Sequence, residues 1–379
     1  MRTPIYFDYN ATSPVDPRVL EKMLPYFTEH FGNASSKLHA YGWMAEEAVK
    51  EARSEVAGLI NCDPSELIFT SGATESINLA IKGVFKAYQK KGNHIILVRS
   101  EHKAVLDCCE SLTKQGAELS YLNVDREGRI DLNELKNAFK DNTILVCVML
   151  ANNETGVIQD IAQIAEITHS KNALLLSDST QAIGKIRVDV QELGIDLMPL
   201  SAHKFYGPKG VGALYVRRKN PRVALVAQQE GGGHENGLRS GTLNVPGIVG
   251  LGAACALAEE EQWNDGIHLS RLRTKLEQSL LELGNVFVNG SQKHRLPNVS
   301  NLCFSGIKAA QLITKLPDLA FSTGSACSSA LPKPSHVLKA MGLDDAAAYA
   351  SARFSLGKYT TEEEVDFCIS KISTALAKD

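Results

Sequence analysis

Between about residues 66 and 220, the chain alternates short apolar runs with longer amphipathic stretches. The apolar runs predict seven strands: "ELIFTS", "HIILVR", "AELSYLNV", "TILVCVML", "ALLLSD", "DLMPLS" and "GALYV". Stretches such as "ESINLAIKGVFKAYQKKG" and "DLNELKNAFKD" predict helices between most of these strands. Strands that alternate with crossover helices indicate an α/β fold with a mostly parallel sheet covered on both faces. In such sheets, ligands collect at the carboxyl ends of the strands.

The rest of the chain predicts a second, smaller unit of α+β type. A glycine-rich loop at 228–247, "QQEGGGHENGLRSGTLNVPG", ends the alternating pattern, and the helical segments "PGIVGLGAACALAEEEQ" and "HLSRLRTKLEQSLLELG" follow. Strands are expected near "VSNLCFS" and "ARFSL", and "TTEEEV" predicts a last helix with a capping threonine and acidic residues in its first turn. Because 379 residues are too many for one small core, we expect a large domain at 14–250 and a small domain formed by 1–13 and 251–379.

Composition and charge narrow the class of partners. Hydrophobic residues make up 44% and charged residues 22% of the chain, which is typical of a soluble globular protein. The net charge of −3 gives no general attraction to nucleic acid or to acidic membranes. No stretch approaches the ~18 consecutive apolar residues of a membrane span, and "MRTPIYFDYNATSP" holds no apolar signal core. We therefore expect a cytoplasmic protein with no direct nucleic-acid or membrane partner.

Eight cysteines are scattered along the chain without a C-x-x-C pair. In a chain of this length, that pattern argues against a disulfide framework or a zinc ribbon, so no metal site is expected. Most should be small buried residues, such as Cys147 inside "TILVCVML". Cys327 differs, because "STGSACSSALPKPS" surrounds it with small, polar, flexible residues. A thiol in such a loop can react as the thiolate, although an unremarkable surface cysteine is the alternative.

Two neighbouring strand ends carry groups that suit one cofactor. Asp178 follows the apolar run of "LLLSDSTQAIGK", and Lys204 follows the next run in "SAHKFYGPKG". A carboxylate at the end of a buried strand needs a cation or a hydrogen-bond donor. An aspartate and a lysine together suit pyridoxal phosphate, which binds a lysine through its aldehyde and an acid through its ring nitrogen. Thr74, Ser201 and His203 would then hold the phosphate. The alternatives are a helix-capping aspartate and a lysine in an ordinary surface loop.

Three further motifs are ambiguous when each is taken alone. "TSGATESINLAI" follows a strand and opens a helix, which makes either an anion site or an ordinary cap through Ser71 or Thr74. His102 in "RSEHKAVL" could stack on a planar ring and exchange protons near neutral pH, although lone histidines are more often structural. Arg353 in "SARFSLGKYT" suits either a substrate carboxylate or an internal ion pair.

Taken together, the order and spacing of the motifs resemble the cysteine desulfurases of the NifS and IscS type. These are pyridoxal-phosphate enzymes of fold type I, the fold of aspartate aminotransferase, in the class-V aminotransferase superfamily. The resemblance implies a three-layer large domain with a seven-stranded sheet and a smaller α+β domain. It runs from residue 5 to about 370 and rests on "YFDYNATSP", "GNASSKLHAYG", "FTSGATESIN", "EHKAVL", "ANNETGVIQ", "DSTQAIGK", "SAHKFYGPKGVGALY", "GGGHENGLRSGTLNVPGIVG", "STGSACSSA" and "RFSLGKYTTEEEVDF".

The resemblance also implies how the cofactor is held. Lys204 would bind it covalently, Asp178 would pair with its ring nitrogen, and Gln181 would donate a hydrogen bond to its phenolic oxygen. His102 would stack on the ring and act in catalysis. The remaining cofactor contacts would come from Ala73, Thr74, Asn153, Thr180, Ser201 and His203.

Substrate and partner contacts follow from the same resemblance. Arg353 and Asn153 would hold the carboxylate of L-cysteine. The Cys327 thiolate would attack the substrate sulfur, release L-alanine and carry the sulfur as a persulfide to an acceptor protein. Thr242 in "RSGT" would reach the phosphate of a partner subunit, which implies a homodimer with shared sites.

Other readings of the function stay open at this stage. The acceptor could serve iron–sulfur cluster assembly, tRNA thiolation or DNA phosphorothioation, because the family feeds all three. A selenocysteine lyase or a small aminotransferase is the nearest alternative enzyme, but an aminotransferase has no use for the thiol of Cys327. A non-catalytic scaffold is a third reading. This third reading is disfavoured because a scaffold would need none of the three residues Lys204, Asp178 and His102.

Overall fold

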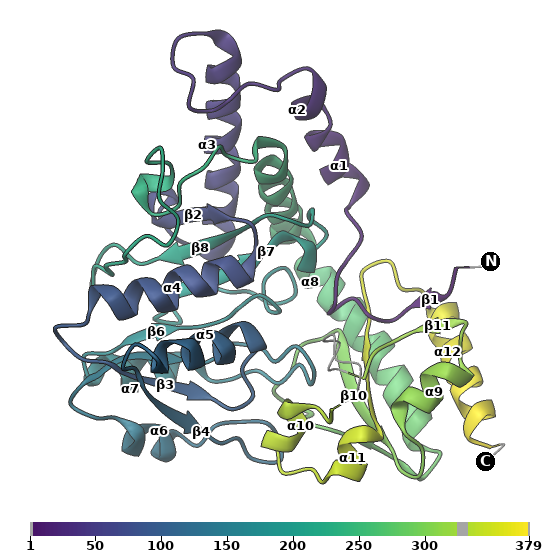
Figure 1. Cartoon of the computed structure of the whole chain (residues 1–379). Helices are drawn as coiled ribbons and strands as arrows, with labels where there is room; N and C mark the ends of the chain where they lie inside the picture. Colours follow the sequence, from purple (N-terminus) through teal and green to yellow (C-terminus); the bar gives the residue numbers. More distant parts are fainter. Residues whose placement is uncertain (1–2, 324–332, 378–379) are drawn as a thin grey trace.

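The computed structural model describes residues 3–323 and 333–377. Figure 1 shows a large α/β part and a smaller part, and both ends of the chain lie beside the smaller part. Cys327 falls between the two described ranges, so its sequence-based role has no structural counterpart here. Within the described ranges, no helix is long and apolar enough to cross a membrane.

The large part is built on one seven-stranded sheet. Its order is β2 (Leu67–Thr70), β8 (Gly212–Val216), β7 (Leu197–Ser201), β6 (Leu174–Leu176), β5 (Thr143–Cys147), β3 (His94–Val98) and β4 (Glu118–Leu122). The strands from β7 to β4 are parallel, and β8 alone runs antiparallel to both of its neighbours. All seven strands coincide with the predicted apolar runs, so the prediction of the fold class is confirmed.

Helices cover both faces of this sheet, which explains why its strands are almost continuously apolar. Ile95 and Leu97 of β3 belong to the hydrophobic cluster on one face, whereas Ile96 and Val98 belong to the cluster on the other. The first face is covered by α4 (Ala73–Ala87) and α5 (Lys103–Thr113). The second is covered by α3 (Ala40–Ile60), α6 (Leu132–Ala138), α7 (Ile161–Ser170) and the first part of α8 (Val245–Leu281).

Shorter elements complete the large part. Helices α1 (Pro17–Met23) and α2 (Pro25–Thr28) lead into α3. Short 3-10 turns lie at η1 (Pro64–Glu66), η2 (Ala202–Lys204) and η3 (Glu235–Gly237). Turn η2 follows β7 directly, so it continues the strand into the loop that carries Lys204.

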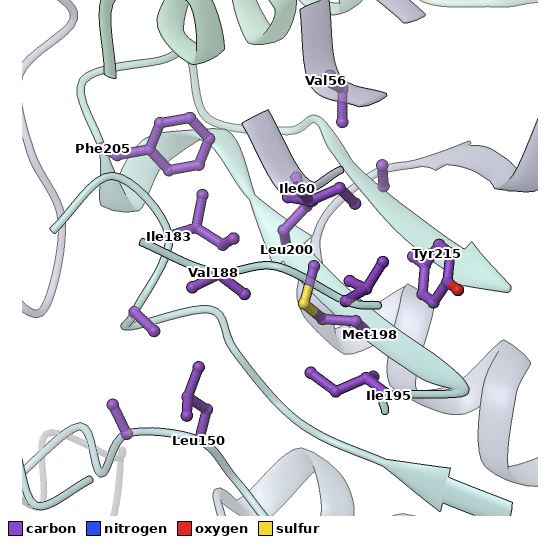
Figure 2. Close-up of a cluster of buried hydrophobic side chains, with 14 of the residues drawn as sticks. Val56, Ile60, Leu150, Ile183, Val188, Ile195, Met198, Leu200, Phe205 and Tyr215 are labelled. Carbon is purple, nitrogen blue, oxygen red and sulfur yellow. The ribbon is translucent and has the colours of Figure 1, made fainter. Parts of the chain in front are cut away.

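A cluster of buried side chains fixes the position of that turn. Figure 2 shows Met198 and Leu200 of β7 near Ile60, with Ile183 and Phe205 to their left in the same cluster. Phe205 is only 2% exposed although it follows Lys204 directly. Burial of this phenylalanine anchors the chain at the end of β7, because side chains in close-packed interiors have little freedom to shift.

The small part contains two minor sheets and the end of the long helix. The antiparallel sheet has the order β12 (Ser351–Ser355), β10 (Val299–Phe304) and β9 (Val286–Val288), and β1 (Ile5–Tyr6) pairs with β11 (Leu319–Ala320). Its helices are α9 (Ala309–Lys315), α10 (His336–Ala340), α11 (Asp345–Tyr349) and α12 (Glu362–Leu376).

Helix α8 joins the two parts. Leu251 and Cys255 pack in the core of the large part, whereas Leu269, Leu272 and Leu276 pack in the core of the small part. The two predicted helical segments are therefore one continuous helix.

The cap of the last helix matches its prediction. Thr361 accepts a hydrogen bond from the amide of Glu364, and the amide of Thr361 donates to Glu364 in return. This reciprocal pair is the capping box that "TTEEEV" predicted.

Candidate active site

A cavity of about 690 Å³ lies at the carboxyl ends of the parallel strands. Segments after β2, β3, β5, β6 and β7 contribute to its wall, and Arg353 of β12 contributes from the small part. The wall contains eleven of the site residues predicted from the sequence: Ala73, Thr74, His102, Asn153, Asp178, Thr180, Gln181, Ser201, His203, Lys204 and Arg353. Residues more than 270 positions apart in the chain thus share one site.

Lys204 extends its amine into this cavity from the turn after β7. Its Nζ donates hydrogen bonds to the main-chain oxygens of Asn10 at 2.7 Å and Ala11 at 2.9 Å. Burial, helped by the nearby charge of Arg353, lowers the pKa of Lys204 to about 8. A useful fraction of the amine is therefore uncharged near neutral pH, which is what attack on an aldehyde requires. The alternative of an ordinary surface loop is wrong for Lys204.

Asp178 and Thr180 form a turn at the end of β6. Asp178 is 6% exposed, and its Oδ1 accepts a hydrogen bond from the amide of Thr180 at 3.0 Å. This contact stabilises a turn and caps no helix, so the helix-cap alternative for Asp178 is wrong. The hydroxyl of Thr180 is buried without a hydrogen-bond partner among the described residues. A buried polar atom left without a partner is costly, and a bound ligand with a polar group would supply one.

His102 begins helix α5 and presents its ring to the cavity. Its Nδ1 accepts a hydrogen bond from the amide of Ala104 at 3.1 Å, so the neutral ring carries its proton on Nε2. The surrounding protein displaces water from the imidazole, and this burial lowers the pKa of His102, with Asp178 and Lys204 acting in opposite directions. A neutral, flat ring fits stacking on another ring system.

The start of helix α4 forms an anion cradle with the end of β7. The helix is capped by Gly72, which has φ +145° and no side chain to satisfy the first amides. A Cβ on Gly72 would lie 3.3 Å from Ser201 Oγ, so the glycine keeps this space open. An uncapped N-terminus of a long helix attracts phosphate. The alternative in which Ser71 or Thr74 caps the helix is wrong.

His203 stands beside the same cradle. Its Nδ1 lies 3.1 Å from Thr12 Oγ1. Burial, followed by the charges of Lys204, Lys209 and Lys185, lowers the pKa of His203 to about 4. His203 is therefore a neutral hydrogen-bonding side chain at neutral pH.

Arg353 and Asn153 meet at the wall between the two parts. Arg353 Nη2 donates to Asp8 Oδ1 at 2.6 Å, and Nη1 donates to the main-chain oxygen of Asn153 at 2.9 Å. The internal ion pair is thus present, but Asp8 does not line the cavity whereas Arg353 does. Two buried atoms, Arg353 Nε and Asn153 Oδ1, have no partner among the described residues. Of the two, Arg353 Nε is a free donor for a ligand carboxylate, whereas Asn153 Oδ1 is an acceptor that suits a donor group of a ligand.

Gln181 also lines the cavity. Its Nε2 donates to the main-chain oxygen of Asn10 at 2.9 Å, and its Oε1 accepts from Lys185 Nζ at 2.9 Å. Sequence reasoning missed both Asn10 and Lys185. Asn10 lies in the quoted segment "YFDYNATSP". It acts here through its main-chain oxygen, which every residue type has, so the sequence could not indicate this contact.

Of the predicted site residues that the structure describes, one lies outside the wall of the cavity. Thr242 is exposed and is not part of the wall of its own chain. Cys327 lies outside the described residues. Sequence reasoning also missed His336, which lines the cavity and donates from Nε2 to the main-chain oxygen of Glu101 at 2.9 Å.

The other thiols of the chain are sequestered. All seven cysteines that the structure describes are free. Burial raises the pKa of Cys108 to about 12, and it also raises the pKa of Cys62, Cys255, Cys303 and Cys368. These groups are neutral thiols at physiological pH.

Comparison with known proteins identifies similar chains over the whole length. The family model for Aminotransferase class-V matches residues 5–367. The cysteine desulfurase IscS of Colwellia psychrerythraea is 53% identical over 99% of this chain and 93% of its own length. The cysteine desulfurase IscS of Proteus mirabilis is 51% identical over 100% of this chain and 94% of its own.

Solved structures agree in fold. A NifS-like protein superposes with a TM-score of 0.93 and 40% identity, with full coverage of both chains. SspA in complex with cysteine reaches a TM-score of 0.82 at 36% identity and covers 94% of this chain and 99% of its own. DndA from Streptomyces lividans reaches 0.79 at 39% identity, with coverage of 91% and 97%.

Proposed function

The chain belongs to the class-V aminotransferase family, as a pyridoxal-phosphate-dependent cysteine desulfurase, and from this premise we propose how its own residues carry out the reaction. The substrate is L-cysteine and the sulfur goes to an acceptor protein. The observation that supports our assignment is that the amine of Lys204, the carboxyl group of Asp178 and the imidazole of His102 line one cavity. Each stands at the end of a different strand, as a planar ring ligand between them requires.

The residues present fit the cofactor. The partnerless hydroxyl of Thr180 and the uncapped start of α4 supply hydrogen-bonding groups that the protein itself does not use. Lys204 would bind the aldehyde carbon, Asp178 would face the ring nitrogen and Gln181 the phenolic oxygen. Ala73, Thr74, Ser201 and His203 would surround the phosphate, and Asn153 and Thr180 would add contacts to the ring. When bound, pyridoxal phosphate supplies a ring that withdraws electrons from the α-carbon of an attached amino acid.

The chain's own residues would then handle substrate and protons. Arg353 and Asn153 would bind the carboxylate of cysteine and fix the orientation of its side chain. Lys204 Nζ, with its lowered pKa, would accept and return protons at the substrate carbon, and His102 Nε2 would exchange protons with the bound substrate. Such positioning supplies much of the catalytic effect in reactions of this kind.

We assign the sulfur-accepting role to Cys327 on the basis of its sequence surroundings. Its thiolate would form an S–S bond with the substrate sulfur while the carbon–sulfur bond breaks. The electron pair of that bond stays with the carbon fragment, which takes up protons and leaves as L-alanine. No external oxidant or reductant is needed, because the two sulfurs together give up two electrons when the S–S bond forms, and the carbon fragment takes up those two electrons as it becomes L-alanine.

Two variants test this assignment separately. Cys327→Ser should keep the visible absorption of the bound cofactor but release no sulfide from L-cysteine. Lys204→Ala should lose the visible band itself, because no amine remains to bind the aldehyde. Undiminished sulfide release by Cys327→Ser would refute the persulfide role, and a wild-type protein that takes up no cofactor would refute the whole assignment.

We further propose a homodimer in which Thr242 reaches the phosphate site of the partner subunit. An exposed apolar surface supports this proposal, since monomeric proteins rarely expose such patches without a partner. It lies on α1, α2 and the start of α3, which project from the large part in Figure 1. It comprises Leu20, Leu24, Phe27, Phe31, Leu38, Tyr41, Trp43 and Met44, and Leu38 is 94% exposed.

The dimer is testable by size. Phe31→Asp should convert the dimer to a monomer in analytical ultracentrifugation, because it places a charge in the contact. Trp263→Asp is the matched control, because Trp263 is 78% exposed on α8 and is not one of the residues of this surface. A wild-type monomer with full activity would contradict the proposal.

We also propose a cell compartment, a class of sulfur acceptor and a domain division for this chain. Free cysteines throughout the described residues support a reducing compartment, the cytoplasm. An iron–sulfur scaffold or a thiolation protein is the acceptor that we propose. We keep the domain division proposed from the sequence, 14–250 against 1–13 with 251–379, whose boundary falls inside α8.

A further inference from the structure

Lys185 lies behind the wall of the cavity, on the side away from the ligand space. Its Nζ donates to Gln181 Oε1 at 2.9 Å and to the main-chain oxygen of Gln181 at 3.1 Å. It does not line the large cavity, but it lines a small enclosed space of about 10 Å³ together with Lys204. The reaction described above assigns no role to this lysine.

Lys185 determines which way the Gln181 amide points. An amine that donates twice to Gln181 requires an acceptor, so Oε1 must face Lys185. On the opposite side, Gln181 Nε2 donates to the main-chain oxygen of Asn10. A flipped amide would place nitrogen against nitrogen at Lys185 and oxygen against oxygen at Asn10. The orientation with Nε2 toward the cavity side is therefore fixed at both ends.

The same carbonyl links Gln181 to Lys204. The main-chain oxygen of Asn10 accepts from Gln181 Nε2 at 2.9 Å and from Lys204 Nζ at 2.7 Å. Gln181 Nε2 carries a second hydrogen that Asn10 does not use, and this donor is available to the phenolic oxygen of a cofactor held on Lys204. A hydrogen-bond donor fixed beside the phenolic oxygen stabilises the deprotonated, negatively charged form of that oxygen.

The surroundings of Lys185 make it unusual as a structural residue. No carboxylate of the described ranges forms an ion pair with it. Burial, followed by the charges of Lys204 and Arg353, lowers the pKa of Lys185 to about 7. An amine donates hydrogen bonds in either protonation state, so the hold on Gln181 persists as the charge is lost. The other titratable groups that face it are Tyr9, His203, Tyr206 and Asp265.

We propose that Lys185 is a positioning residue that locks the Gln181 amide and thereby favours the deprotonated form of the cofactor held on Lys204. This inference rests on the proposed cofactor site and adds to it a residue that touches neither cofactor nor substrate. Without Lys185 the amide can rotate, and the phenolic oxygen loses its fixed donor. A phenolic oxygen without a fixed donor favours its protonated form.

The readout is the pH at which the visible band of the bound cofactor changes, measured without cysteine. In Lys185→Met this midpoint should rise by about one pH unit relative to wild type. Lys185→Arg keeps a donor and a positive charge, so its midpoint should return toward wild type. Lys86→Met is the matched control, because Lys86 is exposed on α4, and its midpoint should not move.

A double-variant cycle separates the route through Gln181 from a direct charge effect. If Lys185 acts through the amide, adding Lys185→Met to Gln181→Leu should leave the midpoint almost where Gln181→Leu alone puts it. An undiminished second shift would overturn the proposal, and so would an unchanged midpoint in folded, cofactor-loaded Lys185→Met. If Lys185→Met does not fold, Lys185→Gln retains an N–H donor without the charge and should shift the midpoint less than one unit. A wild-type protein without a visible band would instead refute the cofactor site itself.

Discussion

At the scale of single residues, burial is the main reason why the pKa of the Lys204 amine is low, and the positive charge of Arg353 adds to it. Lys204 is held by two main-chain oxygens, which accept hydrogen bonds from both the charged and the neutral amine. Because those acceptors carry only partial charge, they do not offset the loss of hydration that lowers the pKa of Lys204 to about 8.

The first prediction concerns cofactor uptake by the cofactor-free protein. The rate of appearance of the visible band should rise with pH and level off above a midpoint near pH 8, because the pKa of Lys204 is about 8 and only its neutral amine reacts. Stopped-flow absorbance at constant ionic strength measures this rate. A midpoint near that of an ordinary lysine, about pH 10.4, would show that burial does not act on this amine.

From the sequence, we could predict those site residues whose polar or charged side chains stand at the ends of apolar strands. Asp178 and Lys204 drew attention because charged groups end buried strands, and both line the cavity. Asn10 and Lys185 escaped for different reasons. The contact of Asn10 uses its main-chain oxygen, and Lys185 stands in the turns that follow β6, four positions after Gln181, where a lysine is unremarkable.

At the scale of elements, the anion cradle depends on three segments approaching without side chains between them. Gly212 of β8 pairs with Thr70 of β2 and with Ser201 of β7. A Cβ on Gly212 would lie 2.3 Å from the oxygen of Leu200 and 2.7 Å from the Cα of Gly72. The start of α4 can therefore approach the sheet only because β8 has a glycine at this position.

We therefore predict that Gly212→Ala weakens both stability and cofactor retention. The added methyl group must push Gly72 away from Ser201, and overpacking of this kind costs about 2 kcal/mol of unfolding free energy. Urea unfolding and dialysis against cofactor-free buffer measure the two effects. Gly58→Ala in α3 is the control, since its nearest neighbour would be 3.8 Å away, and it should be neutral or slightly stabilising. Equal cofactor retention in both variants would contradict this account of the cradle.

Apolar runs predicted the strands well because a doubly covered sheet buries nearly every strand residue. The same pattern could not reveal that β8 runs antiparallel, because a buried strand has the same composition in either direction. The apolar pattern also could not predict that the two helical segments form the single helix α8, because their apolar residues pack in two different cores.

At the scale of the whole molecule, a buried charge cluster ties the small part to the large part. Asp16 is 1% exposed and lies next to α1, and it accepts hydrogen bonds from Arg18 and from Lys358, which follows β12. Lys358 also donates to Glu261 of α8 at 2.9 Å. The Arg18 guanidinium, together with Lys358, holds the pKa of Asp16 well below its usual range.

Lys358→Met should loosen this junction. Removing one charged partner of Asp16 should lower the unfolding free energy by about 2 kcal/mol at neutral pH, since Arg18 still compensates part of the buried charge. The pKa of Asp16 is depressed, so its stabilisation is present above the ordinary aspartate pKa and is lost as pH falls toward the lower folded value. The difference between wild type and variant should therefore shrink below about pH 4.

Urea unfolding at several pH values measures this difference. Lys371→Met is the control, because Lys371 pairs with Asp318 at the surface and such pairs contribute about 0–1 kcal/mol. An equal loss in both variants would contradict the special role of the buried cluster.

The sequestered cysteines have a consequence for a protein that handles reactive sulfur. Sulfur passes between thiols only when a thiolate attacks, and neutral thiols are poor attackers. Burial keeps the thiols of Cys108, Cys255 and Cys368 neutral and inaccessible, so they do not take part in sulfur transfer. The fold thus keeps these three thiols from taking up a sulfur atom that has been removed from cysteine.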